Sequence, residues 1–388
     1  MSSIKASNLS RCSSKRWIVD RATLRQARAD DIRYLPEPEY LDYLSIYFAN
    51  AITKLGRKLQ FKQRIIATAI VFFRRFYLKN SYCETDPFLV IAACCYVAAK
   101  AEESPAHIKT VVSEARSLFS QEAYNCKIFP TENSKLAEME FYLVGDLECD
   151  LLVFHPYRTL MTLCRCSRED FFPVQGFQGV EKFRFDFEAG ELGAGVNGPD
   201  GRRYWGTGEG QLELSEGALQ TAWFIINDTY RSDICLLYEP HLIAVAAIYL
   251  TLMLHPQTCE TIELQLEEAC VGDLTPSHSR RSTRKTTARD PVGFLAGLNV
   301  SFSLIAAIAQ EIISSYSRWD RYKEDVSFSA MSPLTPLEVP LGLPDVTPTM
   351  LSALLVRIRE ARLADLSHPP NGRPLVVNKF LERTAVVG

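Results

Sequence analysis

The stretch PFLVIAACCYVAAK, residues 87–100, decides the fold. It follows Asp86 and begins with a proline, which favours the first turn of a helix. Apolar residues then occupy every side of this helix, so it fits only a place surrounded by other helices. Its many alanines and its two cysteines allow those helices to approach closely. The stretch ends in Lys100 and two glutamates, which indicates that this end of a buried helix reaches the surface.

Helical spacing of apolar residues extends on both sides of this stretch, from residue 37 to residue 153. The flanking segments with this spacing are 36–59, 61–81, 107–120 and 131–151. In the second of these, a wide apolar face predicts that Arg74, Arg75 and Lys79 are left to solvent. In the last, Thr131 is a candidate N-cap. We therefore predict a five-helix repeat over 37–153, with 87–100 at its centre.

A second set of helical segments runs from 154 to 322. Its segment 239–254, EPHLIAVAAIYLTLML, again opens near a proline and has a small-residue, apolar centre. Two insertions without a sustained period interrupt the set, near 168–212 and 257–291. The repetition predicts an all-α fold with two tandem five-helix repeats.

Both ends of the chain carry a further predicted helix. The N-terminal segment, 1–36, contains an amphipathic stretch over 15–32, with Trp17, Leu24 and Ala27 on one side and Arg21, Arg25 and Arg28 on another. The C-terminal tail, 323–388, is punctuated by prolines and predicted to be partly disordered, with a short helix at 350–366. The apolar stripe of that helix can dock on the repeats or on another protein; it comprises Leu351, Leu354, Leu355, Ile358 and Leu363.

The totals exclude several classes of protein. A net charge of −3 over 388 residues argues against a general nucleic-acid binder. No apolar run is long enough to span a membrane, and no signal peptide is evident. The eleven cysteines are scattered without a CxxC pair, which predicts reduced thiols and no metal site. His155 and Cys164 lack a third orienting residue, so a thiol nucleophile is not favoured and no cofactor is expected.

The residues now described resemble the cyclin C family, the cyclin subunits of the Mediator kinase module. The resemblance is carried by AAKAEE at 98–103, LAEMEFYL at 136–143, LLVFHPYRTL at 151–160 and INDTYRSDICLLY at 226–238. The insertion near 168–212 is foreign to the pattern of that family, and the chain resembles a fungal-type member that carries insertions. The cell-cycle cyclins' substrate-docking motif in the first helix does not appear. The aromatic residues that usually begin the family's N-terminus are missing before Trp17.

The resemblance implies a cyclin fold and a regulatory function without catalytic chemistry. In this family, the residues matching Lys100 and Glu140 make the main polar contacts to a cyclin-dependent kinase. Val144, one turn beyond Glu140, is expected to add apolar contact, although core packing remains open for it. Trp17 is expected to anchor the kinase, the alternative being that it seals the edge of the bundle. The implied partners are the Mediator-associated kinase and other subunits of its module, in the nucleus, regulating RNA polymerase II transcription.

Two other kinds of protein remain open at this point. One is another transcriptional cyclin, of the H, K or T type, which has the same fold and a different kinase. The other is a promoter factor of the TFIIB type, which shares the double five-helix fold. A TFIIB-like factor calls for a zinc ribbon near the start and a basic surface over the repeats, and neither pattern is seen.

Overall fold

A computed structural model describes residues 16–124, 129–166, 212–255, 300–324 and 345–367, together with Leu295 and Leu298. The predicted insertions and the predicted disorder of the tail lie almost entirely outside these residues. The chain divides into two compact units, which we treat separately. Of the described residues, the first unit comprises those within 19–152, 231–237 and 315–367, and the second unit comprises those within 16–18, 153–230 and 238–314. The exact domain boundaries proposed from the sequence stay predictions.

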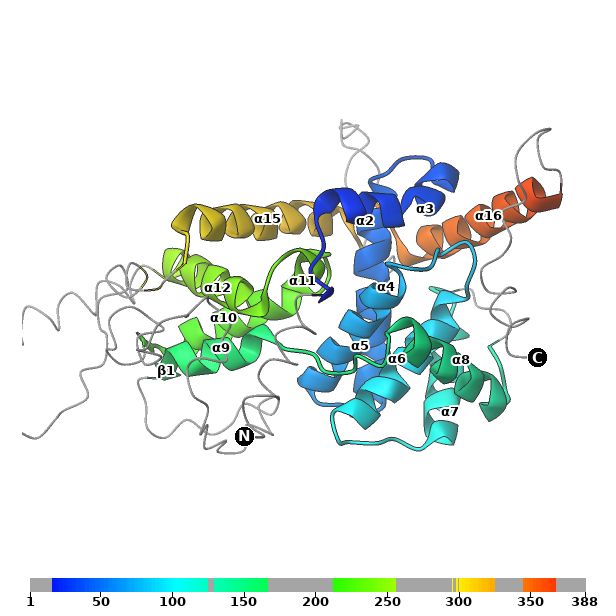
Figure 1. Ribbon diagram of the computed structural model, residues 1–388, viewed down its shortest axis with the longest axis horizontal. Coiled ribbons are helices and arrows are strands. Elements are labelled where there is room, and N and C mark those ends of the chain that lie inside the picture. The colour runs from blue at the N-terminus through cyan, green and yellow to red at the C-terminus, as the bar shows by residue number, and fades with distance from the viewer. Residues whose placement is uncertain are drawn as a thin grey trace, which may run out of the picture. The chain divides into compact units, whose positions relative to one another are not determined.

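The first unit is a helical bundle built around one central helix (Figure 1). The central helix is α6 (Pro87–Ala101), and it packs against the other four helices of the bundle. Those helices are α4 (Tyr40–Lys58), α5 (Gln63–Phe76), α7 (Ile108–Phe119) and α8 (Asn133–Asp146). The prediction of a five-helix bundle with 87–100 at its centre is therefore confirmed.

Local sequence explains where α6 begins and why it is central. The Asp86 side chain accepts a hydrogen bond from the backbone N of Phe88 at 3.1 Å, and Pro87 occupies the first turn. Nearly every side chain from Pro87 to Ala99 is buried, on all sides of the helix. Small side chains keep the helix thin enough to be enclosed by four neighbours. The N-cap predicted for α8 is wrong, because Glu132 and not Thr131 precedes that helix, and it makes no side-chain cap.

Two arginines of α5 are buried, which corrects the prediction that they face solvent. Arg74 forms an ion pair with Asp233, which lies in the 231–237 segment of the same unit. Arg75 donates to the backbone carbonyl of Asp150 at 3.4 Å, and burial lowers its pKa to about 10. Only Lys79 keeps a partly exposed side chain, held by Glu148 at 2.7 Å. The buried charge of Arg74 is tolerated because Asp233 pairs with it.

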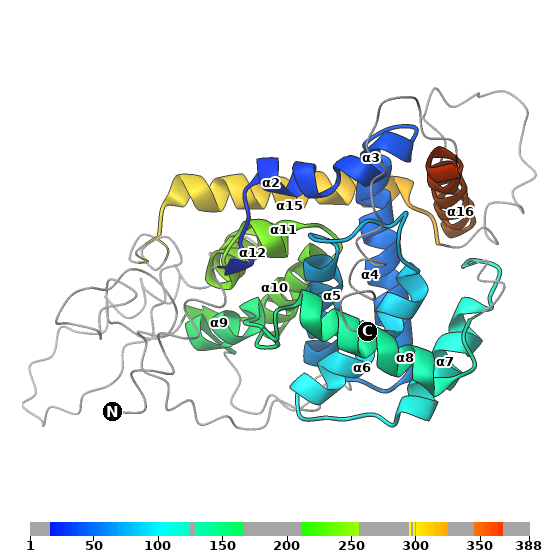
Figure 2. The ribbon, with the colours of Figure 1, turned by 45° about the vertical axis from the view of Figure 1, so that its right-hand side comes forward.

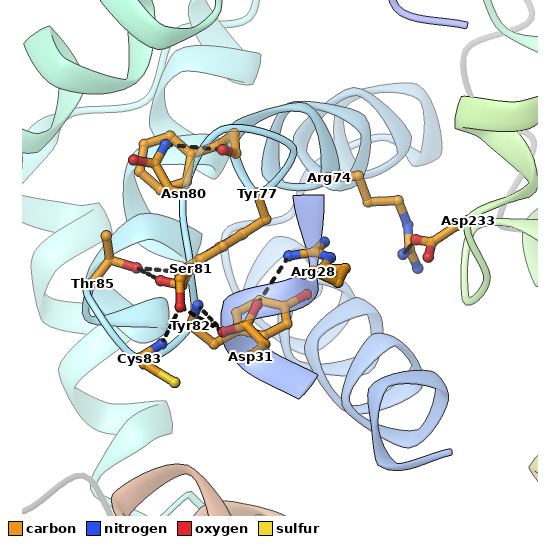
Figure 3. A network of polar contacts seen from close by, with 11 residues as sticks. Arg28, Asp31, Arg74, Tyr77, Asn80, Ser81, Tyr82, Cys83, Thr85 and Asp233 are labelled. Atoms are coloured by element: carbon orange, nitrogen blue, oxygen red, sulfur yellow. Dashed lines mark hydrogen bonds and ion pairs between the residues drawn. The ribbon is translucent and has the colours of Figure 1, made fainter. Parts of the chain in front are cut away.

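The N-terminal segment forms two short helices instead of one. They are α2 (Arg21–Ala27) and α3 (Ala29–Tyr34), and Arg28 lies at the break between them. Arg28 is buried, not solvent-facing as its predicted helical position implied. Its guanidinium lies over the rings of Tyr82 and Tyr77, with centroid distances of 4.7 and 5.7 Å (Figure 3).

The buried carboxylate of Asp31 ties α3 to the segment that follows α5 (Figure 3). Its Oδ1 accepts hydrogen bonds from Ser81 Oγ at 2.6 Å and from the backbone N of Tyr82 at 2.8 Å. Arg28 Nη1 lies 3.7 Å from its other oxygen. These contacts make the N-terminal helices part of the first unit.

The predicted helix at 350–366 is observed as α16 (Pro348–Ser367), a longer helix than expected. It packs against α3 and α4 of the first unit (Figure 2). Four residues of its apolar stripe are buried there: Leu351, Leu354, Leu355 and Ile358. The fifth, Leu363, is exposed. Of the two alternatives, docking on the repeat is therefore the one observed.

The second unit is built around α12 (Pro240–Leu254), whose small apolar side chains are buried between two other helices. These are α9 (Pro156–Leu163) and α10 (Glu216–Thr229). The Ser215 side chain caps α10 by accepting from the backbone N of Ala218 at 3.2 Å. The last helix is α15 (Phe302–Arg321), of which the part up to residue 314 belongs to this unit.

Two short elements complete the description. Strands β1 (Cys164–Cys166) and β2 (Leu212–Leu214) form a parallel pair in the second unit, which helical periodicity did not predict. Helix α11 (Ile234–Leu237) belongs to the first unit and contacts α5. Among the described residues, no helix has both the length and the apolar character needed to cross a membrane.

Candidate functional site

The predicted pair Lys100 and Glu140 is brought together on the surface of the first unit. Lys100 lies at the C-terminal end of α6, and Glu140 lies in the middle of α8, which runs beside it (Figures 1 and 2). Lys100 Nζ donates to Glu140 Oε1 at 2.7 Å. The side chains are 43% and 24% exposed, so both charged ends remain within reach of a partner.

Tyr96, one turn before Lys100 on α6, contacts the ammonium group of the lysine with its ring. Lys100 Nζ lies 4.1 Å from the centre of the Tyr96 ring, a cation–π distance. Partial burial lowers the pKa of Lys100, but Glu140 and Tyr96 outweigh that effect and raise the pKa above its usual value. The last carbonyls of α6 also favour a cation at this end. The lysine is thus charged and positioned before any partner arrives.

Glu102, two residues further on, has a structural task. It accepts a hydrogen bond from Thr68 Oγ1 at 2.7 Å and pairs with Arg64 Nε at 2.6 Å, both on α5. Glu102 therefore fastens the end of α6 to α5, while Lys100 points to α8. Glu103 follows with a φ of 54°, which turns the chain away from the helix.

Val144 and Trp17 complete the predicted set, and the structure places them differently. Val144 lies one turn after Glu140 on α8 and is half-buried, so part of its side chain reaches the surface next to the pair. Trp17 is only 4% exposed. A buried indole favours the alternative that Trp17 packs inside the protein. Its role as a kinase anchor stays a prediction that this burial does not favour.

One exposed aromatic residue was not predicted as part of the site. Phe141 follows Glu140 on α8, and its side chain is 70% exposed. In the sequence it stands among apolar residues that are buried, such as Met139 and Leu143. Its direction around the helix differs from theirs by about 160°, and this difference is the signal that could have found it.

The weaker candidate, a thiol nucleophile at Cys164 near His155, is not supported by the geometry. His155 Nδ1 lies 2.6 Å from the hydroxyl of Tyr230, so the imidazole has a structural partner. Burial raises the pKa of the Cys164 thiol far above its usual value, which disfavours the reactive thiolate. Among the described residues there is no group of three or more potential ligands that could hold a metal ion.

Comparisons with known proteins show which proteins this chain is similar to. The family model for the cyclin N-terminal domain matches residues 25–152. An RNA polymerase II holoenzyme cyclin-like subunit of Mycosarcoma maydis is 36% identical over 350 residues, covering 78% of this chain and 86% of that protein. The subunit of the same description from Saccharomyces cerevisiae is 30% identical over 295 residues and covers 73% of each chain. A chain in the structure of the CAK complex of Chaetomium thermophilum bound to ATP-gamma-S is similar at 17% identity and a TM-score of 0.44, covering 92% of this chain and 93% of that one.

Proposed function

The chain belongs to the cyclin family, in the group of RNA polymerase II holoenzyme cyclin-like subunits, and from this we propose its function. It is the regulatory subunit of a cyclin-dependent kinase, and the kinase is the enzyme. We propose that this kinase is the one of the Mediator kinase module, that the chain acts with the other subunits of that module, and that it works in the nucleus on RNA polymerase II transcription.

The observation that carries the proposal is the ion pair of Lys100 and Glu140 on the surface of the first unit. A cation and an anion 2.7 Å apart on neighbouring helices offer a donor and an acceptor side by side. Such a pair can bind a backbone carbonyl and a backbone amide of a partner helix at the same time. Charge-assisted hydrogen bonds of this kind gain strength when the partner covers them and excludes water.

The proposed mechanism is a shift of a two-state equilibrium in the kinase. A protein kinase is active when its mobile helix places a glutamate against the lysine that holds the ATP phosphates. The chain binds the inward position of that helix more tightly than the outward position. The equilibrium then shifts by as much as the two affinities differ. The relatives are described as RNA polymerase II holoenzyme cyclin-like subunits. That description supports the Mediator kinase as the partner over the kinases of H, K or T type cyclins.

The test of the proposal is kinase activation by the purified chain. The chain alone is expected to show no phosphotransfer, and a Mediator-type cyclin-dependent kinase is expected to phosphorylate the RNA polymerase II C-terminal repeat when the chain is added. The scaffold subunit of the module is included in a parallel reaction. Recovery of a different kinase with the tagged chain would show that it belongs to another cyclin type.

Variants of the ion pair test whether Lys100 and Glu140 make the contact. Lys100→Glu is expected to weaken kinase binding by about 2–5 kcal/mol, because Glu140 is left unpaired in the covered interface. Lys135→Glu is the matched control, since Lys135 forms an exposed ion pair with Glu138 on α8, the helix that carries Glu140. Unchanged kinase binding by both Lys100→Glu and Glu140→Lys would contradict the assignment, provided that circular dichroism shows native helix content.

A further inference from the structure

Helix α16 has an open face, opposite the one that packs on α3 and α4. On this face the side chains of Met350 and Val356 are 38% and 46% exposed. Ala353 and Ala364 are exposed there as well. Apolar side chains that line one face of a surface helix are typical of a surface that another protein covers.

Two opposite charges lie in the middle of this face. Arg357 and Glu360 are both exposed. Within the part of the chain that the structure describes, neither side chain has a hydrogen-bond or ion-pair partner. An arginine placed before a glutamate is also the less favourable order for a pair within one helix. The helix itself therefore does not explain these charges, and a partner across the face would pair them.

The spacing of the exposed positions is that of a seam between two helices. Five exposed residues follow one another at intervals of three, four, three and four positions, which is the heptad repeat of paired helices. They are Met350, Ala353, Arg357, Glu360 and Ala364. The small alanines let a second helix approach closely. The face therefore fits another helix that lies along it.

The seam is complementary to itself when a second copy runs in the opposite direction. With the two-fold axis between positions 358 and 359, Arg357 of one copy faces Glu360 of the other. Ala353 then faces Ala364, so small residues meet on both sides of the charges. In a parallel pair, by contrast, arginine would face arginine and glutamate would face glutamate. Such like charges repel, so the charges select the antiparallel arrangement and fix its register.

We propose that two copies of the chain associate through α16, as an antiparallel pair with two-fold symmetry. The symmetry repeats each contact, so the pair of Arg357 and Glu360 forms twice. One helix from each copy makes a small interface, and the dimer is therefore expected to be weak, with a Kd on the order of 10–100 µM. The inference does not depend on the proposed function, because no kinase takes part in the contact.

The seam lies far from the pair of Lys100 and Glu140. Arg359 of α16 donates to the backbone carbonyl of Thr85, just before α6 begins, whereas Lys100 lies at the other end of α6. The length of α6 separates the two places by about 20 Å. In both views α16 lies apart from α8 (Figures 1 and 2). A dimer therefore leaves the ion pair open, and Lys100→Glu is expected not to change self-association.

Charge reversal in the full chain tests the seam. Arg357→Glu places a glutamate opposite Glu360 of the other copy, and it is expected to weaken self-association at least about tenfold because like charges then face each other. Glu360→Arg is expected to have the same effect. The double variant, Arg357→Glu with Glu360→Arg, restores the opposite charges and is expected to dimerise like the unaltered chain. Sedimentation velocity at concentrations on both sides of the expected Kd measures the association.

A mixture of the two single variants gives the sharpest result. The chain with Arg357→Glu carries two glutamates in the seam, and the chain with Glu360→Arg carries two arginines. Each is expected to be monomeric alone, and the two are expected to form a heterodimer when mixed. Lys109→Glu is the control, since it makes the same change of charge at an exposed position in the first turn of α7 and leaves the seam intact. Circular dichroism checks that every variant keeps its helix content.

The inference is overturned if the unaltered chain stays monomeric at every concentration. It is also overturned if the charge-reversed single variants dimerise as well as the unaltered chain, or if their mixture gives no heterodimer. A chain that dimerises as described but binds no kinase would contradict only the proposed function.

Discussion

At the scale of single residues, the charges that end α6 divide into two groups with different tasks. Lys100 is directed towards α8 and keeps its charged end at the surface. Glu102 is directed towards α5, where Arg64 and Thr68 hold it. A lysine and a glutamate two positions apart on a helix point in different directions, since the helix turns by about 100° per residue. Lys100 is therefore the residue that we propose as the partner contact, whereas Glu102 holds α6 to α5.

Trp17 supplies a prediction at the same scale. Because its side chain is 4% exposed, Trp17→Ala is expected to lower the free energy of unfolding by about 3–5 kcal/mol. The lost contacts and the cavity left behind both contribute. Urea unfolding followed by circular dichroism measures the change, with Trp17→Phe expected to lose less. A variant that unfolds like the unaltered chain and yet binds the kinase more weakly would show that Trp17 is a partner anchor after all.

At the scale of elements, α16 is attached to the first unit by polar contacts at one end and apolar contacts at the other. Arg362 forms an ion pair with Glu84, and both side chains are largely buried. Arg359 donates to the backbone carbonyl of Thr85. Asp365 accepts from Arg33 at 2.9 Å and from the Tyr34 hydroxyl at 3.1 Å on α3. Leu351 and Ile358 supply the buried apolar side. The helix is thus an integral part of the unit.

Breaking the buried ion pair is expected to loosen α16. Arg362→Ala leaves the Glu84 carboxylate buried without its partner, which costs about 3–5 kcal/mol for a fully buried pair. Hydrogen exchange is expected to accelerate in α16 and α3 while α6 stays protected. Leu363→Ala, at the neighbouring exposed position, is the control and should exchange like the unaltered chain. Equal protection of α16 in both variants would mean that its apolar side alone keeps it docked.

At the scale of the whole molecule, six cysteines with described side chains are free thiols and are distributed over both units: Cys83, Cys94, Cys95, Cys149, Cys164 and Cys235. Burial raises the pKa of Cys83 and of Cys95 to about 12, and that of Cys235 to about 11. Cys149, just beyond α8, is exposed. The buried thiols serve as small apolar side chains in the packing, and they are poor nucleophiles because the thiolate is the reactive form.

Alkylation therefore separates the cysteines by position in the fold. At pH 8 the folded chain is expected to react with iodoacetamide at Cys149 more than about 100-fold faster than at Cys83 or Cys95, because the thiolate fraction falls tenfold for each unit of raised pKa. Peptide-resolved mass spectrometry measures the rates, and the chain unfolded in urea serves as the control in which the difference vanishes. Fast reaction of Cys95 in the folded chain would contradict the central, enclosed position of α6.

The sequence by itself determined the helices of the first unit and which of them is enclosed. Periodicity and composition are local properties, and an all-apolar helix of small residues such as 87–100 has no stable place except among other helices. The sequence also indicated Lys100 and Glu140 as the candidate kinase-binding pair, because short motifs carry the resemblance to the family. Their separation of 2.7 Å needed the packed arrangement of α6 and α8.

Only the tertiary structure decided which side chains at the edges of helices are buried. Arg74 was predicted to face solvent, and it is buried because Asp233, far along the chain, supplies the opposite charge. Arg28 is buried because the rings of Tyr77 and Tyr82, which belong to another segment, cover its guanidinium. Phe141 resembles a core residue in the sequence, but its side chain is exposed. The helices that pack against α8 cover the opposite face of that helix. A residue's partner across the fold determines the free energy of burying it, and local spacing along the chain contains no information about that partner.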